Sequence, residues 1–130
     1  MQDSVFTKII KGEVPCHRVY EDSKTLAFLD IHPVQPGHTL VIPKKQVEFV
    51  WDLDDETYQA LMQTAKKVAE QLREVLKVPF IGEQIIGVDV PHAHVHLIPF
   101  SNMEGFRARA DMNVEPDHTA LAEMVKKLAF

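Results

Sequence analysis

The sequence predicts one α+β domain built on an antiparallel sheet. Three observations favour this fold class. Five short segments have the composition of strands, most of them are joined by turns too short for a crossover helix, and one long amphipathic helix separates the third strand from the fourth. The 130 residues suffice for a single domain with its own hydrophobic core.

The first half of the chain predicts a short helix followed by three strands, at residues 5–12, 17–21, 25–31 and 38–43. Gly12 ends the helix. Along the third strand His38 alternates with Leu40 and Ile42, so these side chains share one face of the sheet.

The second half predicts a long helix, two more strands and a final helix, at residues 54–77, 80–88, 94–100 and from about 116 onward. Apolar residues recur along the long helix at helical spacing and mark the face that packs on the core. Acidic residues suit its first turn, and Pro79 stops it.

Composition and charge restrict the possible partners. The formal net charge of −5 argues against general binding to nucleic acid or to an anionic membrane, and no apolar run approaches membrane-spanning length. The single cysteine, Cys16, excludes a disulfide framework and is expected to be a packing residue. Because the start of the chain also lacks the apolar stretch of a signal peptide, we expect a cytoplasmic protein.

Three histidines alternate with apolar residues in the segment His-Ala-His-Val-His-Leu-Ile at residues 92–98. Because a strand sends alternate side chains to opposite faces, His92, His94 and His96 are expected to line one face. Their rings would lie roughly 6.5 to 7 Å apart, a spacing that suits the surrounding of one phosphate group. A neutral imidazole is a competent nucleophile at pH 7, so the middle ring can attack phosphorus while its neighbours hold oxygens or transfer a proton.

Two other classes of function stay open for this row. A His-x-His pair on a strand can ligate zinc, although no carboxylate follows at short spacing and no second Cys or His pair completes the set. A binding module that grips phosphate without turnover is the other alternative. For the favoured route no metal or organic cofactor is expected.

The row matches the signature of the histidine triad (HIT) family, which the chain resembles over about residues 4–100 in the right order. Three further segments, at residues 5–15, 28–33 and 36–45, resemble that family's opening helix and its two central blocks. The resemblance implies a single HIT domain over 1–130 with its core at about 4–100, an extension over 101–130 that ends in a helix, and a homodimer. It also implies hydrolysis of nucleoside monophosphate conjugates, of the phosphoramidate or dinucleoside polyphosphate type, through a nucleotidyl-histidine intermediate.

The resemblance implies roles for individual residues of this sequence. His94 would be the nucleophile, His96 and His38 would hold the phosphate, and His92 would orient the row. Asp30 would bind the ribose hydroxyls. A purine base would occupy an apolar slot made by Phe6, Ile9, Phe28 and Ile31. Core packing accounts equally well for the apolar members of this set, so both roles stay open.

The chain departs from the family pattern at two places. The glycine-rich stretch before the row is shortened to residues 84–91, with Asp89 where a phosphate-contacting hydroxyl is usual, and Gln84 is a candidate to supply an amide to the phosphate. Some relatives hold a structural zinc with two cysteines and a histidine, and this sequence has Ser4, Thr7 and Gln46 at those positions, which implies that the zinc site is absent.

The remaining polar residues of note are assigned to the surface. Arg107 and Arg109, in the extension, are expected to lie in a solvated loop. His17, His32 and His118 are expected to be surface residues.

Overall fold

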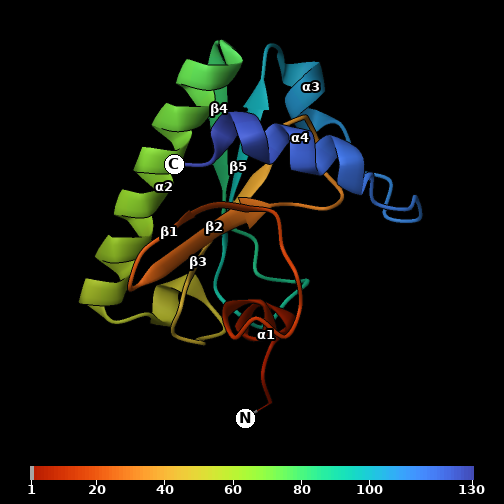
Figure 1. Cartoon of the computed structure of the whole chain (residues 1–130). Coiled ribbons are helices and arrows are strands. Elements are labelled where there is room, and N and C mark those ends of the chain that lie inside the picture. Colours follow the sequence, from red (N-terminus) through yellow and green to blue (C-terminus); the bar gives the residue numbers. More distant parts are fainter. Residues whose placement is uncertain (1) are drawn as a thin grey trace.

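A computed structural model describes residues 2–130 and confirms the α+β architecture with an antiparallel sheet. The strands are β1 (Arg18–Glu21), β2 (Thr25–Leu29), β3 (Thr39–Pro43), β4 (Phe80–Gln84) and β5 (Val95–Phe100). They pair in the order β1-β2-β3-β5-β4 (Figure 1). Strand β5, which contains His96, therefore lies inside the sheet, between β3 and β4.

The helices are α1 (Val5–Ile10), the 3-10 turn η1 (Val50–Asp52), α2 (Asp55–Leu76), α3 (Met103–Arg107) and α4 (His118–Leu128). In Figure 1, α2 runs along the length of the sheet and α4 crosses near β1. Neither η1 nor α3 is predicted from the sequence, because both are too short to show a helical period. No helix within residues 2–130 has the length and apolar character needed to cross a membrane.

Helix α2 confirms the prediction for residues 54–77. The Asp54 carboxylate caps its first turn by accepting a hydrogen bond from the Thr57 backbone N–H, and Lys77 ends it in the left-handed region, with a φ of 56°. Leu61, Val68 and Leu72 are fully buried against the sheet. The apolar stripe is therefore a core face, as its spacing predicts.

The sheet has a hydrophobic layer on each side. Ala27, Val41 and Leu97 face α2 and α4 in the larger core, while Phe28 and Leu40 face α1 in a smaller one. Every residue of β2 and β3 is buried because both faces are covered. The smaller layer is open at one end, and the candidate site lies there.

Five strand boundaries differ from the prediction. β1, β3 and β5 each begin one residue later than expected, at Arg18, Thr39 and Val95, while β2 ends at Leu29 instead of Ile31 and β4 ends at Gln84 instead of Val88. Apolar residues continue beyond the ends of β2 and β4, but the backbone leaves the ladder, and a composition signal does not register that change.

The prediction that the three histidines lie on one regular strand is wrong for His92 and His94, which precede β5. The segment before β5 is held by other bonds, because the His92 backbone N–H donates to the Val90 carbonyl at 2.8 Å and the Ala93 N–H donates to the Val47 carbonyl at 2.7 Å. Strand alternation does not apply to this irregular segment. As a result the His92 side chain is fully buried, while His96 alone of the three lies within the ladder.

Candidate active site

A cavity of about 260 Å³ lies on the α1 side of the sheet. Eight of the residues predicted for the site line it: Phe6, Ile9, Phe28, Asp30, Ile31, Asp89, His94 and His96. The other three predicted residues, His38, His92 and Gln84, are not part of its wall. The structure thus brings most of the predicted set together, with two histidines behind the wall.

Strand pairing explains why residues so far apart in the sequence meet here. Phe28 on β2 pairs with Leu40 on β3, Leu40 pairs with His96 on β5, and His96 pairs with Gln84 on β4. Directly paired residues of antiparallel strands point to the same face. One row across the sheet therefore carries the apolar floor of the cavity and the third histidine of the motif.

The His94 ring is held by the backbone carbonyl of His92. Its Nδ1 lies 2.7 Å from the carbonyl oxygen of His92, and because a carbonyl only accepts, Nδ1 carries the proton. In the neutral ring the lone pair is then on Nε2. The ring is 3% exposed and packs edge-on against Phe6, with ring centroids 5.2 Å apart.

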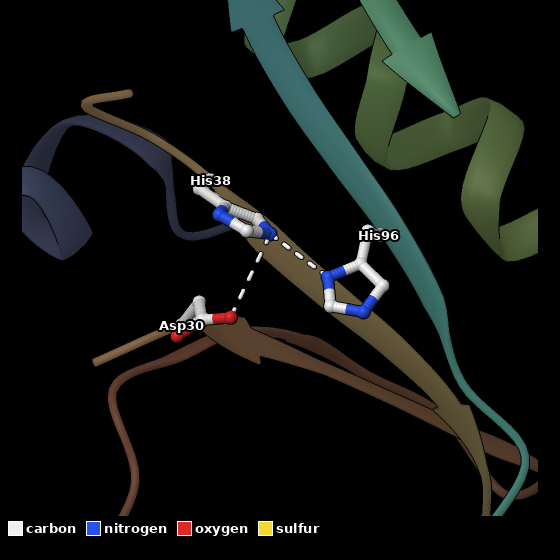
Figure 2. Close-up of side chains that lie close together, drawn as sticks. All are labelled: Asp30, His38 and His96. Carbon is white, nitrogen blue, oxygen red and sulfur yellow. Dashed lines mark hydrogen bonds and ion pairs between the residues drawn. The ribbon is translucent and has the colours of Figure 1, made fainter. Parts of the chain in front are cut away.

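His96 is held by His38. The Val34 backbone N–H donates to His38 Nδ1 at 3.1 Å, so the proton of a neutral His38 is on Nε2. His38 Nε2 lies 3.0 Å from His96 Nδ1, which therefore accepts (Figure 2). The proton of His96 is then on Nε2, the nitrogen that does not bond to His38.

His92 is fixed at both ring nitrogens. Its Nε2 donates to the Pro43 carbonyl at 2.8 Å, and its Nδ1 accepts from the Ser4 hydroxyl at 2.8 Å. Because the side chain is buried behind the cavity wall, it does not reach the cavity. Its link to the site is its carbonyl oxygen, which holds His94.

Burial keeps His38, His92 and His96 neutral. Burial, and then the neighbouring His38 and His94 rings, lower the pKa of His96 to about 4. Burial also lowers the pKa of His38, which the Asp30 carboxylate partly offsets, and it lowers the pKa of His92. At neutral pH these three rings are thus present in the single-proton forms that their hydrogen bonds require.

The Asp30 carboxylate sits at the end of β2, beside His38. Its Oδ1 accepts from the His32 backbone N–H at 2.9 Å, and its Oδ2 lies 3.6 Å from His38 Nε2 (Figure 2). Its side chain is 20% exposed and lines the cavity, so it remains available to a hydroxyl of a ligand.

The apolar residues of the slot serve the core and the cavity at once. Phe6 and Phe28 are 6% and 4% exposed and meet edge to face with ring centroids 5.4 Å apart, yet both line the cavity. Ile31 is 42% exposed at the same cavity. Both roles that the sequence left open are therefore compatible with the packing.

The two residues of the shortened segment differ in position. Asp89 is exposed and lines the cavity, and its carboxylate raises the pKa of His96 slightly against the larger effects that lower it. Gln84 shares the sheet face of His96 but does not line the cavity. An amide contact from Gln84 to a phosphate therefore gains no support from its position.

The fold and the histidine arrangement agree with the comparison to known families. The family model described as the HIT domain matches residues 11–103. The chain belongs to the HIT family. This match covers all five strands and helix α2.

Three relatives illustrate how closely this HIT protein follows its family. It is 39% identical over 114 residues to the protein Hit of Bacillus subtilis, which covers 82% of this chain and 78% of the relative. It is 39% identical over 101 residues to the adenosine 5′-monophosphoramidase of Schizosaccharomyces pombe, covering 77% and 76%. A solved Hit-like protein of Bartonella henselae superposes with a TM-score of 0.81 at 33% identity, covering 97% and 94%.

One cluster within residues 2–130 of this HIT protein has the composition of a metal site, namely Asp30, His38 and His96, with ligand atoms within 4.8 Å of one another. Its hydrogen bonds oppose that role. A metal on His38 Nε2 would require the proton to move to Nδ1, where it would meet the N–H of Val34. His92, a ligand in the zinc alternative, uses both ring nitrogens for hydrogen bonds.

The cavity wall also holds residues that were not predicted for the site. His32, expected at the surface, lines the cavity. Cys16 packs against the smaller core, as expected, and lines the cavity as well, and burial raises the pKa of its thiol. Met112 lines it from the extension and is 65% exposed. A lone methionine in a loop carries no local signal of such a position. Arg107 and Arg109 are exposed and lie outside the wall, but Arg107 ends helix α3, so the expected loop position is wrong for Arg107.

Proposed function

We propose that this protein hydrolyses nucleoside monophosphate conjugates of the phosphoramidate or dinucleoside polyphosphate type through a nucleotidyl group on His94. The observation that carries the proposal is the 2.7 Å bond from His94 Nδ1 to the His92 carbonyl, which leaves the lone pair on Nε2 of a ring in the cavity wall. The similarity to an adenosine 5′-monophosphoramidase supports hydrolysis of a nucleotide.

The reaction has two steps. The His94 Nε2 lone pair forms a bond to the α-phosphorus, and the bond from phosphorus to the leaving nitrogen or oxygen breaks, with its electrons moving to the leaving group. His96, which carries a second proton once the anionic substrate is bound, gives its Nε2 proton to the leaving atom and becomes neutral. A water molecule then attacks phosphorus and returns a proton to His96, and the phosphorus–nitrogen bond breaks to release the monophosphate.

The protonation state of His96 would change when substrate binds. An anionic phosphate close to His96 Nε2 raises the pKa of this ring, which favours its use as an acid. Asp30 would bind the ribose hydroxyls, and the base, which we propose to be a purine, would lie between the apolar residues of α1 and β2. An apolar slot does not distinguish adenine from guanine, because it does not read the base edges.

We also propose that the protein works as a homodimer in the cytoplasm. The support is the free edge of the sheet at β4, where Phe80 is 52% exposed and stacks on Phe100 with ring centroids 5.3 Å apart. An unpaired edge strand with an exposed aromatic residue suits pairing with a second copy. Light scattering coupled to size exclusion tests this, and a monomer at all concentrations contradicts it.

The test of the reaction compares wild type, His94→Ala and His118→Ala on adenosine 5′-phosphoramidate and on a diadenosine polyphosphate. His118 is an exposed histidine outside the cavity and serves as the matched control. We expect turnover in wild type and His118→Ala, no turnover in His94→Ala, and no effect of a chelator.

Intact mass measured after an alkaline quench, which preserves phosphohistidine, should show one added nucleotidyl group on wild type and none on His94→Ala. Binding without turnover in every variant would identify a binding module instead. Loss of activity with chelator would identify a metal enzyme.

A further inference from the structure

Four polar side chains meet under the N-terminus of α1, behind the cavity wall. They are Ser4, Thr7, Gln46 and His92. Ser4 is 5% exposed and His92 is fully buried, so their polar atoms have no access to bulk water. A buried polar group without a hydrogen-bond partner would lower the stability of the fold. The contacts among the four side chains show which donor is paired with which acceptor.

The roles of donor and acceptor at Ser4 follow from its neighbours. Its Oγ accepts from the Thr7 backbone N–H at 3.0 Å, as the N-cap of α1, and lies 2.8 Å from His92 Nδ1. Because Pro43 holds the His92 proton on Nε2, the Ser4 hydroxyl is the donor to Nδ1. The backbone N–H of Ser4 donates to Gln46 Oε1 at 2.9 Å, which fixes the residue itself.

We propose that Ser4 is a positioning residue for the nucleophile, acting through His92 on His94. The Ser4 hydroxyl donates a hydrogen bond to the His92 ring, and the carbonyl of the same residue accepts one from His94 Nδ1. His92 therefore connects Ser4 to His94. Helix α1, which Ser4 begins, also supplies Phe6, and that ring packs on both histidines with centroids 5.8 Å and 5.2 Å away. Ser4 thereby joins the apolar wall of the cavity to the histidine that would attack phosphorus.

The expected effect of Ser4 on kcat rests on the proposed function. Its expected effect on the orientation of the His94 ring does not. Loss of the Ser4 hydroxyl leaves the buried Nδ1 of His92 without its closest donor, because Thr7 Oγ1 lies farther away, at 3.3 Å, and donates to Gln46 Oε1. The His92 carbonyl is then held less firmly, and His94 loses part of its orientation. Orientation acts on the chemical step, so kcat is expected to fall while KM stays unchanged.

The experiment uses three variants. Ser4→Gly removes the hydroxyl but keeps most of the capping preference, Ser4→Thr keeps the hydroxyl, and Asp54→Ala removes the cap of α2 far from the histidines. For Ser4→Gly we expect kcat to fall by roughly tenfold, the equivalent of one lost hydrogen bond. We expect the kcat of Ser4→Thr and that of Asp54→Ala to stay within about twofold of the wild-type value, which is the scatter of such kinetic comparisons.

A nuclear magnetic resonance measurement of the ring nitrogens provides a readout that does not depend on turnover. In Ser4→Gly the His92 Nδ1 resonance should shift, and the His94 Nδ1–H proton should exchange faster with solvent. Both signals should be retained in Ser4→Thr and in Asp54→Ala.

The results separate this inference from the proposed function. Wild-type kcat and wild-type His94 exchange in Ser4→Gly would overturn the role of Ser4, and so would an equal loss of activity in Asp54→Ala. If wild type turns over no nucleotide conjugate, the proposed function fails, and the two ring signals alone decide whether Ser4 positions His94.

Discussion

His38 Nε2 lies 3.0 Å from Nδ1 of His96, and the backbone N–H of Val34 decides which of the two nitrogens holds the proton. Because Val34 donates to His38 Nδ1, His38 donates to His96, and the remaining proton of His96 stays on Nε2. One backbone group in the loop before β3 thus sets the protonation of two rings.

Two substitutions at His38 separate its two hydrogen bonds. His38→Gln places an amide N–H near the position of Nε2 and keeps a donor to His96, while His38→Asn places an oxygen near the position of Nδ1 and keeps the acceptor for Val34. We expect His38→Asn to lower kcat by roughly tenfold, the worth of one hydrogen bond, and His38→Gln to keep most of it. Steady-state kinetics on the phosphoramidate test this, and equal losses in both variants would contradict it.

The buried histidines predict a loss of stability in acid. The pKa of His96 falls from 6.5 in the unfolded chain to about 4 in the fold, mainly through burial. Between these two values the unfolded chain binds more protons than the native state, so the free energy of unfolding decreases as the pH falls through this window and is fully restored above it.

The size of this effect is measurable by urea unfolding at pH 7 and pH 5. A fully buried ring with this shift would contribute up to about 3 kcal/mol, and screening by solvent at the half-buried His96 reduces the expected contribution to about 1 to 2 kcal/mol. His96→Gln should lose that part of the pH dependence. A variant as sensitive to pH as wild type would show that His96 does not cause it.

The position of Met112 at the cavity predicts that its substitution weakens substrate binding without changing the rate of the chemical step. Met112 reaches the cavity from the extension and lines it together with Ile31 and other apolar residues. A thioether contact with an aromatic base contributes about 0.3–1.5 kcal/mol, so Met112→Ala should raise KM by roughly two- to tenfold and leave kcat unchanged. Met103, exposed and outside the cavity wall, is the control position. An unchanged KM in Met112→Ala would exclude Met112 from the nucleotide site.

The arrangement of side chains around His92 predicts that a zinc site can be introduced there by substitution. Ser4 Oγ, Thr7 Oγ1 and His92 Nδ1 lie 2.8 to 3.3 Å from one another, and Gln46 contacts both Ser4 and Thr7. Small adjustments of such a group allow tetrahedral coordination. The triple variant Ser4→Cys, Thr7→Cys, Gln46→His should bind one zinc ion per chain, with His92 as the fourth ligand.

Metal analysis of the purified protein and the absorption of the cobalt form test this prediction. Adding His92→Ala to the triple variant should abolish tight binding, since only three ligands remain. A triple variant with no more metal than wild type would show that these four positions cannot adopt the required geometry.

Much of the fold could be predicted because it depends on local periods. A two-residue alternation placed His38 and Leu40 on one face, and the helical period of residues 54–77 identified α2. The sequence also identified eight of the residues that line one cavity. Short elements such as α3 were missed because Phe106 is held by packing over Gly82, where any side chain would overlap its ring, and a five-residue segment has no period to detect.

The sequence by itself determined that three histidines lie close together beside an apolar slot, since that follows from their spacing and from the strands that flank them. Only the tertiary structure decided what each ring does. His92 is buried with Ser4 and Pro43, 88 and 49 residues away, as its hydrogen-bond partners, and His38 takes its tautomer from Val34. Periodicity assigns a side chain to a face only while the backbone stays in the ladder, and the position of a proton depends on donors and acceptors that the fold brings together.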